Sequence, residues 1–253
     1  IIESEVIDIL IEKGTVKAVE LVDGTKLGTK SVILTTGTFL NGVIRIGEEK
    51  IKAGRVGDFA SLKLAEKIKG IGLNTGRLKT GTPARLSSKT INWSIVETQK
   101  PDEKPTLLSF LHKKPFQRQI SCGITYTNNN THEIIRENLE RSAIFNGSIT
   151  SNGPRYCPSI EDKVVRFSDR DEHQVFLEPE GLNDDTVYPN GISTSLPKDI
   201  QERYIKSIKG LENVKIKRFG YAVEYDFVNP KDLKSSLEVK NTKGLFLAGQ
   251  VNG

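Results

Sequence analysis

Short apolar runs separated by glycine turns occupy the first forty positions of the chain. Residues 3–11 and 16–22 are two such runs, rich in valine, isoleucine and leucine, with Lys13-Gly14 between them. Two runs of this kind joined by a glycine turn predict a β-hairpin. Residues 31–37 form a continuous β-branched run that ends in glycine. This pattern is typical of a strand buried on both faces of a parallel sheet.

Helical spacing appears further along the chain. Between residues 61 and 71 the apolar positions recur every three or four residues, lysines occupy the other face, and glycines follow. This pattern predicts a helix. Asn130 followed by Glu133 is similar to a capping box and predicts a second helix, to about residue 140.

Patterns typical of loops, strands and helices follow one another along the last two thirds of the chain. Residues 97–117 carry three prolines and predict a connecting loop. Residues 173–179 predict a strand. Residues 197–211 predict a helix with one apolar face, made of Ile200, Tyr204, Ile208 and Leu211. Strands and helices therefore alternate, and we expect an α/β fold.

Composition narrows the class of protein. At 253 residues the chain is long enough for one large domain or two ordinary ones, and no apolar run approaches the roughly 20 residues that span a bilayer. The net charge of +5 tolerates an anionic partner without requiring one. With two cysteines and no secretory leader, we expect a reducing, cytosol-like compartment. Because the chain has no methionine and starts at Ile1, we expect it to be part of a longer polypeptide.

Residues 153–167 carry the densest candidate chemistry. Cys157 lies between Pro154 and Pro158, with arginines and carboxylates nearby. Cations lower a thiol pKa and favour the nucleophilic thiolate, although a free cysteine is more often an inert apolar residue. Ser159, followed by two acidic residues, predicts a helix start whose N–H groups attract anions. We therefore favour a binding loop over a nucleophile.

Two further patterns concern cations and metals. Residues 76–85 are rich in glycine and threonine and carry three cations that suit phosphate or carboxylate groups, Arg77, Lys79 and Arg85. A solvated basic loop is the plainer interpretation, and the residues alone favour it. The three histidines, His112, His132 and His173, are far apart in sequence and lack the spacing of metal ligands, so we expect no metal site.

Several stretches, taken together and in order, resemble one family, the glucose-inhibited division protein A family. Its members are FAD-dependent tRNA uridine 5-carboxymethylaminomethyl modification enzymes. The resemblance covers essentially the whole chain and is carried by residues 36–40, 76–83, 153–167, 176–181, 188–197, 220–227 and 245–253.

The resemblance implies an α/β two-dinucleotide-fold flavoprotein. Its FAD domain would be partial and discontinuous, formed by residues 1–85 and 196–253, with an inserted α/β NADH and substrate domain at 86–195. The FAD contacts implied are Val6, Thr36, Gly37, Ser61 and Gln250. The NAD segment implied is Gly153, Pro154, Arg155, Tyr156, Cys157, Pro158, Ser159, Ile160, Glu161, Asp162, Lys163, Val164, Val165, Arg166 and Phe167, with Cys157 also a candidate catalytic residue.

The resemblance also implies an activity and partners. The family modifies C5 of the wobble uridine of tRNA in the cytoplasm, using FAD, NADH and methylenetetrahydrofolate. Its members act as homodimers with a partner GTPase in a heterotetramer, and Arg77, Lys79 and Arg85 become candidates for holding tRNA or phosphate. The family's opening glycine-rich phosphate loop is not among these residues, so we expect this chain alone to bind FAD weakly or not at all and to be inactive. A folate- and FAD-dependent tRNA uridine methyltransferase and a non-catalytic binding fragment remain the alternatives.

Overall fold

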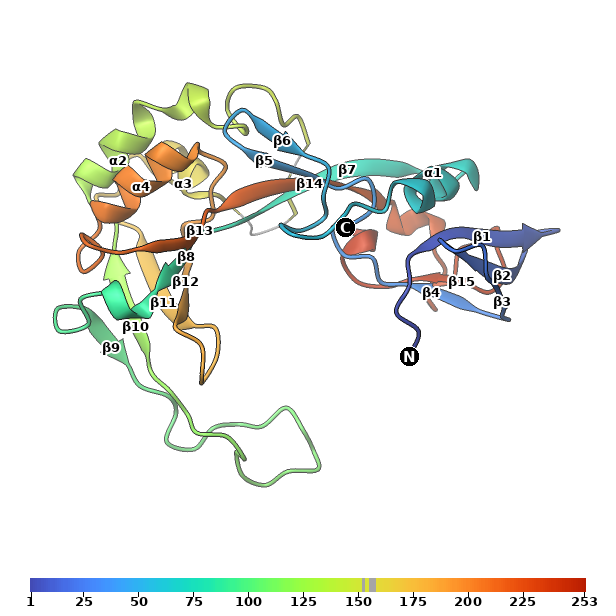
Figure 1. Ribbon diagram of the computed structural model, residues 1–253, viewed down its shortest axis with the longest axis horizontal. Helices are drawn as coiled ribbons and strands as arrows, with labels where there is room; N and C mark the ends of the chain where they lie inside the picture. The colour runs from blue at the N-terminus through green and yellow to red at the C-terminus, as the bar shows by residue number, and fades with distance from the viewer. Residues whose placement is uncertain (152, 155–157) are drawn as a thin grey trace.

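The computed structural model describes residues 1–151, 153–154 and 158–253. Figure 1 shows an elongated molecule with a lobe at each end and a long ribbon of strands between them. The chain starts in one lobe, passes through the other and returns, so that both termini lie on the side of the first lobe. Among the described residues, no helix has the length and apolar character needed to cross a membrane.

The first lobe is built from two small sheets and one helix. A three-stranded antiparallel sheet contains β1 (Val6–Glu12), β2 (Thr15–Leu21) and β3 (Lys26–Gly28). The predicted hairpin is confirmed, because β1 pairs antiparallel with β2 and both turn residues, Lys13 and Gly14, have positive φ angles of 46° and 71°. The helix α1 (Leu62–Gly70) is also confirmed, and it buries Leu64, Ala65 and Ile68.

The predicted parallel strand is confirmed as well. β4 (Val32–Leu34) pairs in parallel with β15 (Leu245–Leu247), from the other end of the chain. Leu34 is buried, but the side chain of Ile33 is 64% exposed. The expectation of burial on both faces is therefore wrong in this structure, because β4 is short and belongs to a two-stranded sheet.

The ribbon between the lobes is a four-stranded antiparallel sheet. β7 (Thr75–Thr82) and β14 (Tyr221–Val228) pair along their whole length, with β5 (Val43–Ile46) and β6 (Glu49–Ile51) beside them. The loop expected at residues 76–85 is therefore wrong. Glycine supports the strand at Gly76, where a Cβ atom would lie 2.6 Å from the ring of Phe227.

The second lobe is a six-stranded sheet with three helices packed together on one side of it (Figure 1). Its strands, in spatial order, are β13 (Ile216–Arg218), β8 (Arg85–Ser87), β12 (Thr186–Asn190), β11 (Gln174–Pro179), β10 (Cys122–Tyr126) and β9 (Glu97–Gln99). The helices are α2 (Asn129–Arg136), α3 (Ile160–Arg166) and α4 (Lys198–Lys206).

The sequence predictions for this lobe are confirmed in outline. The four apolar positions predicted for the last helix, Ile200, Tyr204, Ile208 and Leu211, are 0% exposed. The helix is shorter than predicted, since α4 ends at Lys206 and Ile208 and Leu211 lie in the segment that follows it. The capping box of α2 differs from the prediction. Asn128 caps the helix and Thr131 completes the box, because the helix begins one residue before Asn130. The loop predicted at residues 97–117 is confirmed only from residue 100, because β9 occupies residues 97–99 and residues 100–121 form no helix or strand.

The apolar cores divide the chain differently from the predicted domain limits. One cluster of buried residues runs from Ala84 to Val214 and includes the face of α4. β13 also pairs with β8. Residues 196–218 therefore pack with the second lobe, and the first lobe's core resumes at Val228. The predicted domain limits at 85/86 and 195/196 stay a prediction. The contacts of residues 196–218 favour a boundary after residue 218, where the chain returns to the first lobe. Short 3-10 helices lie at Ser88–Thr90, Leu139–Arg141, Pro230–Asp232 and Gln250–Asn252.

Candidate functional site

The carboxyl ends of β4 and β15 form one edge of the first lobe. Leu34 pairs with Leu247, and the Ala248 N–H donates to the Leu34 carbonyl at 3.0 Å. Gly37 follows one strand and Gly249 the other, with φ angles of 54° and 85°. A Cβ atom at either glycine would meet no atom within 4 Å, so the backbone there is open. Ligands of α/β proteins bind at this kind of edge, beyond the carboxyl ends of parallel strands.

Ser61 lies against the turn that follows β4. Its N–H donates to the Phe39 carbonyl at 2.9 Å, and its carbonyl accepts from the Asn41 N–H at 3.3 Å. Ser61 precedes α1, but its hydroxyl does not cap that helix. The sequence-predicted FAD residues Thr36, Gly37 and Ser61 therefore lie in neighbouring backbone segments.

Two buried polar atoms at this edge fit a polar ligand. Thr36 Oγ1 and Asn252 Oδ1 have no hydrogen-bond partner among the described residues. A buried, unpaired polar group costs roughly 1–3 kcal/mol, which a bound hydrogen-bonding group would recover. Gln250 precedes Asn252 in the same turn, and its Nε2 donates to the hydroxyl of Tyr225. The residues present thus suit the polar groups of a dinucleotide cofactor. Val6 is different, since it starts β1 and pairs with Leu21 in the other sheet.

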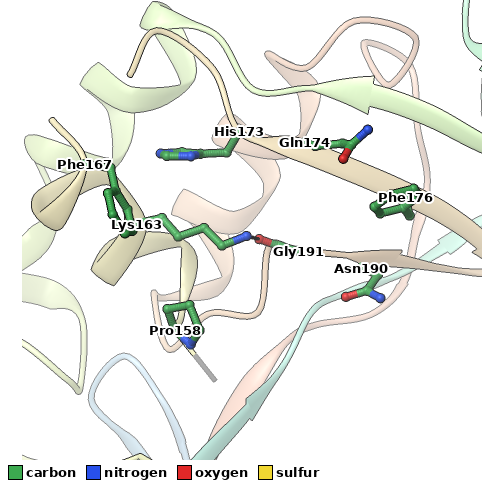
Figure 2. Close-up of a pocket in the computed structure, with 8 residues that line it drawn as sticks. All are labelled: Pro158, Lys163, Phe167, His173, Gln174, Phe176, Asn190 and Gly191. Carbon is green, nitrogen blue, oxygen red and sulfur yellow. Dashed lines mark hydrogen bonds between the residues drawn. The ribbon is translucent and has the colours of Figure 1, made fainter. Parts of the chain in front are cut away.

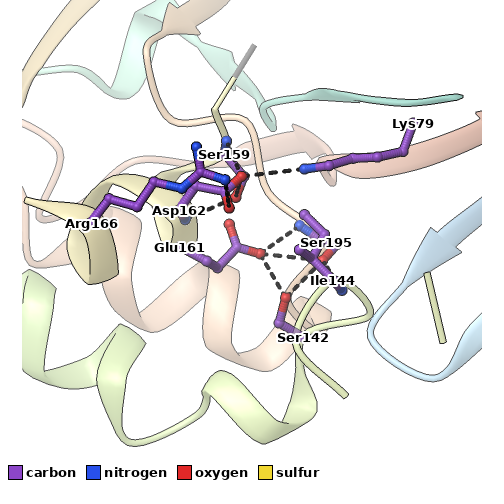
Figure 3. A network of polar contacts seen from close by, with 8 residues as sticks. All are labelled: Lys79, Ser142, Ile144, Ser159, Glu161, Asp162, Arg166 and Ser195. Atoms are coloured by element: carbon purple, nitrogen blue, oxygen red, sulfur yellow. Dashed lines mark hydrogen bonds and ion pairs between the residues drawn. The ribbon is translucent and has the colours of Figure 1, made fainter. Parts of the chain in front are cut away.

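The helix start predicted at Ser159 is confirmed. Ser159 Oγ accepts from the Asp162 N–H at 3.1 Å, and Asp162 Oδ2 accepts from the Ser159 N–H at 3.0 Å (Figure 3). The Ile160 N–H donates to the Ser193 carbonyl at 2.8 Å. The sequence predicts that the N–H groups at this helix start attract an external anion. This prediction is wrong for the N–H groups of Asp162 and Ile160, because Ser159 Oγ and the Ser193 carbonyl already accept their hydrogen bonds.

Glu161 anchors α3 to two other segments of the second lobe. Its side chain is 0% exposed. Its Oε1 accepts from the Ser195 N–H at 2.9 Å and from the Ser142 hydroxyl at 3.0 Å (Figure 3). Its Oε2 has no partner among the described residues. One carboxylate thus fixes the start of α3, to which residues 153–158 lead.

Replacing Glu161 with leucine is expected to lower the free energy of unfolding by about 2 kcal/mol, because the buried Ser195 N–H and Ser142 hydroxyl lose their charged acceptor. Glu161→Gln keeps an amide oxygen for these donors and should cost less. Urea denaturation of the intact protein measures both, with the exposed Glu202→Leu as control. A Glu161→Leu variant as stable as the Glu202→Leu control would contradict this role.

The three cations predicted to hold phosphate are paired with carboxylates. Arg77 Nη1 lies 2.8 Å from Asp226 Oδ1, and Lys79 Nζ lies 3.2 Å from Asp162 Oδ2. Arg85 pairs with Glu180, and its guanidinium also lies 4.3 Å from the centre of the Tyr188 ring. The sequence did not indicate these partners. The tRNA or phosphate role of the cations stays a prediction, and the ion pairs give each of them a structural role.

Lys79 and Asp162 join the ribbon to α3 (Figure 3). Both side chains are only 10% exposed. Burial by itself raises the pKa of Asp162, but hydrogen bonds from Ser159 and the charge of Lys79 outweigh it, so the pKa lies below its ordinary value. Asp162 is therefore a buried anion that Ser159 and Lys79 stabilise.

Part of the predicted NAD segment lies outside the described residues, namely Arg155, Tyr156 and Cys157. Gly153 and Pro154 are half-buried on one side of this gap, and Pro158 on the other. Within the described part of the chain, no cluster of three or more histidine, cysteine or acidic side chains has the arrangement of a metal site.

Sequence reasoning missed a histidine pair. The rings of His132 and His173 lie 5.1 Å apart, although 41 positions separate them in the chain. Burial, and then the neighbouring His173, lower the pKa of His132 to about 4. His132 is therefore neutral near pH 7. No local spacing could have indicated this contact, because β11 and α2 meet only in the folded lobe.

Comparisons with known proteins agree over the whole chain. The family profile described as "Glucose inhibited division protein A" matches residues 1–253. The tRNA uridine 5-carboxymethylaminomethyl modification enzyme MnmG of Zymomonas mobilis is 53% identical over 253 residues, which are 100% of this chain and 41% of that enzyme. The enzyme of the same name from Thermodesulfovibrio yellowstonii is 54% identical over 246 residues, 97% of this chain and 39% of that enzyme.

A solved structure is also similar to this chain over nearly its whole length. GidA of Aquifex aeolicus, in its form I crystal, superposes with a TM-score of 0.91 at 47% identity and covers 99% of this chain and 43% of its own. The sheets and helices are those of a dinucleotide-binding flavoprotein fold. This chain belongs to the glucose inhibited division protein A family. It spans about 41% of the length of the first relatives it matches.

Proposed function

We propose that this chain forms part of a flavoenzyme that modifies C5 of the wobble uridine in tRNA. Membership of the family supports the reaction class, because the relatives are named as tRNA uridine 5-carboxymethylaminomethyl modification enzymes. The single observation that carries the flavin assignment is the edge beyond β4 and β15. Open glycine turns and the unpaired Thr36 Oγ1 lie in the segments that follow these two strands.

In this proposal the residues at the edge of the first lobe would hold FAD. The open backbone at Gly37 and Gly249 lets phosphate or ring atoms approach closely. Thr36 and Asn252 supply hydrogen bonds, and Ser61 and Gln250 border the same turns. When bound, the flavin supplies two-electron redox chemistry. The chain's residues contribute binding and orientation.

Residues 153–167 are the proposed site for NADH. α3 supports this segment through the Glu161 contacts and the Lys79–Asp162 pair. Arg155 is the proposed phosphate contact, and Cys157 the proposed residue closest to the reacting atoms. In this role the segment would hold NADH as the hydride donor for the flavin, and methylenetetrahydrofolate would be the source of the one-carbon unit added at uridine C5.

The proposal also covers the binding partners and the cellular location. tRNA is the substrate, a GTPase is the partner in a heterotetramer, and the enzyme is a cytoplasmic homodimer. The second lobe, built around the core from Ala84 to Val214, is the proposed inserted domain. The net charge of +5 is compatible with an RNA partner.

Flavin absorbance of the intact protein that contains this chain tests the proposal. We expect bound flavin, bleached by NADH in the absence of oxygen. Thr36→Val removes the unpaired hydroxyl at nearly constant volume and should weaken flavin binding about tenfold, because a hydrogen bond made in a buried site is lost. The exposed Thr106→Val is the matched control and should retain flavin. Failure of NADH to bleach the flavin, or equal flavin affinity in both variants, would contradict the proposal.

A further inference from the structure

A cleft opens beside α3 on the side of β11 and β12. It has a volume of about 390 Å³ (Figure 2). Its lining combines one cation, aromatic rings and two amides, contributed by Pro158, Lys163, Phe167, His173, Gln174, Phe176, Asn190 and Gly191. Only three of these, Pro158, Lys163 and Phe167, belong to the predicted NAD segment. The others come from β11, β12 and the residues adjoining them.

Lys163 brings a cation without a partner carboxylate into the cleft. Its Nζ donates to the Gly191 carbonyl at 2.7 Å, and no carboxylate of the described residues lies within ion-pair distance. Only glycine fits position 191 without strain, since the φ angle there is +106° and a Cβ atom would lie 2.7 Å from the Gln174 carbonyl oxygen. Burial lowers the pKa of the Lys163 ammonium. An anion in the cleft would supply the missing opposite charge.

His173 lies beside this cation. Its Nε2 is buried and has no hydrogen-bond partner among the described residues. Burial lowers the pKa of His173, and the positive charges of Lys163 and Arg170 lower it further. The cleft therefore has a positive local field, and its lining includes a buried histidine nitrogen without a hydrogen-bond partner among the described residues.

Aromatic surface and amides complete the cleft. The Phe167 side chain is 50% exposed, and its ring lies 6.5 Å from that of His173. Phe176 is half-buried on the strand that follows His173 (Figure 2). The Asn190 amide donates to Glu178 at 2.9 Å, which leaves the amide oxygen as an acceptor. Flat rings beside a cation are the means by which proteins stack a base and hold its phosphate.

We propose that this cleft binds a nucleoside monophosphate unit, with its phosphate on Lys163 and His173 and its base against Phe176. The assignment rests on the proposed function, which provides two sources of this chemistry. One is a mononucleotide half of NADH, and the other is an unpaired nucleotide of tRNA. A lone phosphate or an uncharged nucleoside offers only half of the contacts and binds more weakly.

Binding of uridine 5′-monophosphate to the intact protein, measured by calorimetry, tests the cleft. We expect Lys163→Gln and Phe176→Leu each to weaken binding about tenfold or more, through loss of the cation and of the stacking ring respectively. Lys206→Gln changes the net charge equally at an exposed position on α4 and should bind as the parent does. Uridine without phosphate should bind at least tenfold more weakly. Thermal melting confirms that the variants are folded.

Competition separates the two sources. Displacement of uridine 5′-monophosphate by NADH assigns the cleft to the cofactor, and displacement by an anticodon stem-loop RNA but not by NADH assigns it to tRNA. Displacement by neither overturns the proposal, as does unchanged affinity in both folded variants. Flavin bleaching by NADH is recorded separately on the parent protein. Its failure alone would contradict the proposed function and leave the nucleotide affinities as the measure of the cleft.

Discussion

Replacing Lys79 with methionine is expected to lower the free energy of unfolding by about 3 kcal/mol. The substitution keeps most of the apolar stem but leaves Asp162 as a buried anion without its closest cation. Removing one partner of a buried ion pair costs roughly 3–5 kcal/mol, and the bonds from Ser159 and the ion pair with Arg166 keep this case near the lower end. Urea denaturation of the intact protein near pH 7 gives the value.

The matched control is the exposed Lys63→Met on α1, which should change stability by less than about 0.5 kcal/mol. The double variant Lys79→Met/Asp162→Asn removes both charges. It should be more stable than the sum of the single changes implies, because Asp162 is then no longer a buried anion whose remaining cation is the exposed Arg166, 3.6 Å away. Additive effects of the two substitutions would show that the pair contributes nothing as a pair.

The pH dependence of stability provides an independent check on the contribution of ionised Asp162. The pKa of folded Asp162 lies below the ordinary 3.8. Its ionised form therefore stabilises the fold above that value, and this contribution is lost as the pH falls through the folded pKa. The difference in stability between the parent protein and Lys79→Met should be full near pH 7 and shrink in strong acid. A difference that stays constant down to pH 2 would assign the effect to packing instead.

Gly42→Ala is expected to reduce flavin affinity at least tenfold and to lower the free energy of unfolding by about 3 kcal/mol. A Cβ atom at Gly42 would lie 2.7 Å from the Ala53 carbonyl oxygen and 2.8 Å from the Thr38 carbonyl oxygen. Both contacts are with backbone, which cannot rotate away as a side chain can. The segment that carries Thr36 and Gly37 must therefore shift.

Gly28→Ala is the matched control, since a Cβ atom there would meet nothing within 4 Å and the φ angle is not positive. Flavin occupancy and urea denaturation of the intact protein give the two readouts. Full flavin occupancy in Gly42→Ala would show either that the segment tolerates the shift or that the flavin lies elsewhere. Unchanged flavin affinity in a Gly42→Ala variant whose stability falls as expected would contradict the assignment of this edge.

Local patterns predicted the elements of this chain well. The Lys13-Gly14 turn, the apolar face of α1 and the Ser159 cap were identified from a few neighbouring residues, because each depends on contacts within one turn or hairpin. Prediction was wrong where packing overrode the local signal. The glycines and threonines of residues 76–82 indicate a loop, yet pairing with all of β14 makes them a strand.

The candidate sites depended on contacts between distant segments. The sequence alone established the α/β class and the family and indicated the segments with candidate chemistry, because these signals lie in short stretches read in order. Only the tertiary structure placed Gln250 beyond the same edge as Thr36, paired Lys79 with Asp162 and brought His173 to Lys163. These contacts join residues on separate strands and helices. They form when sheets pair and cores pack, and no spacing along the chain encodes them.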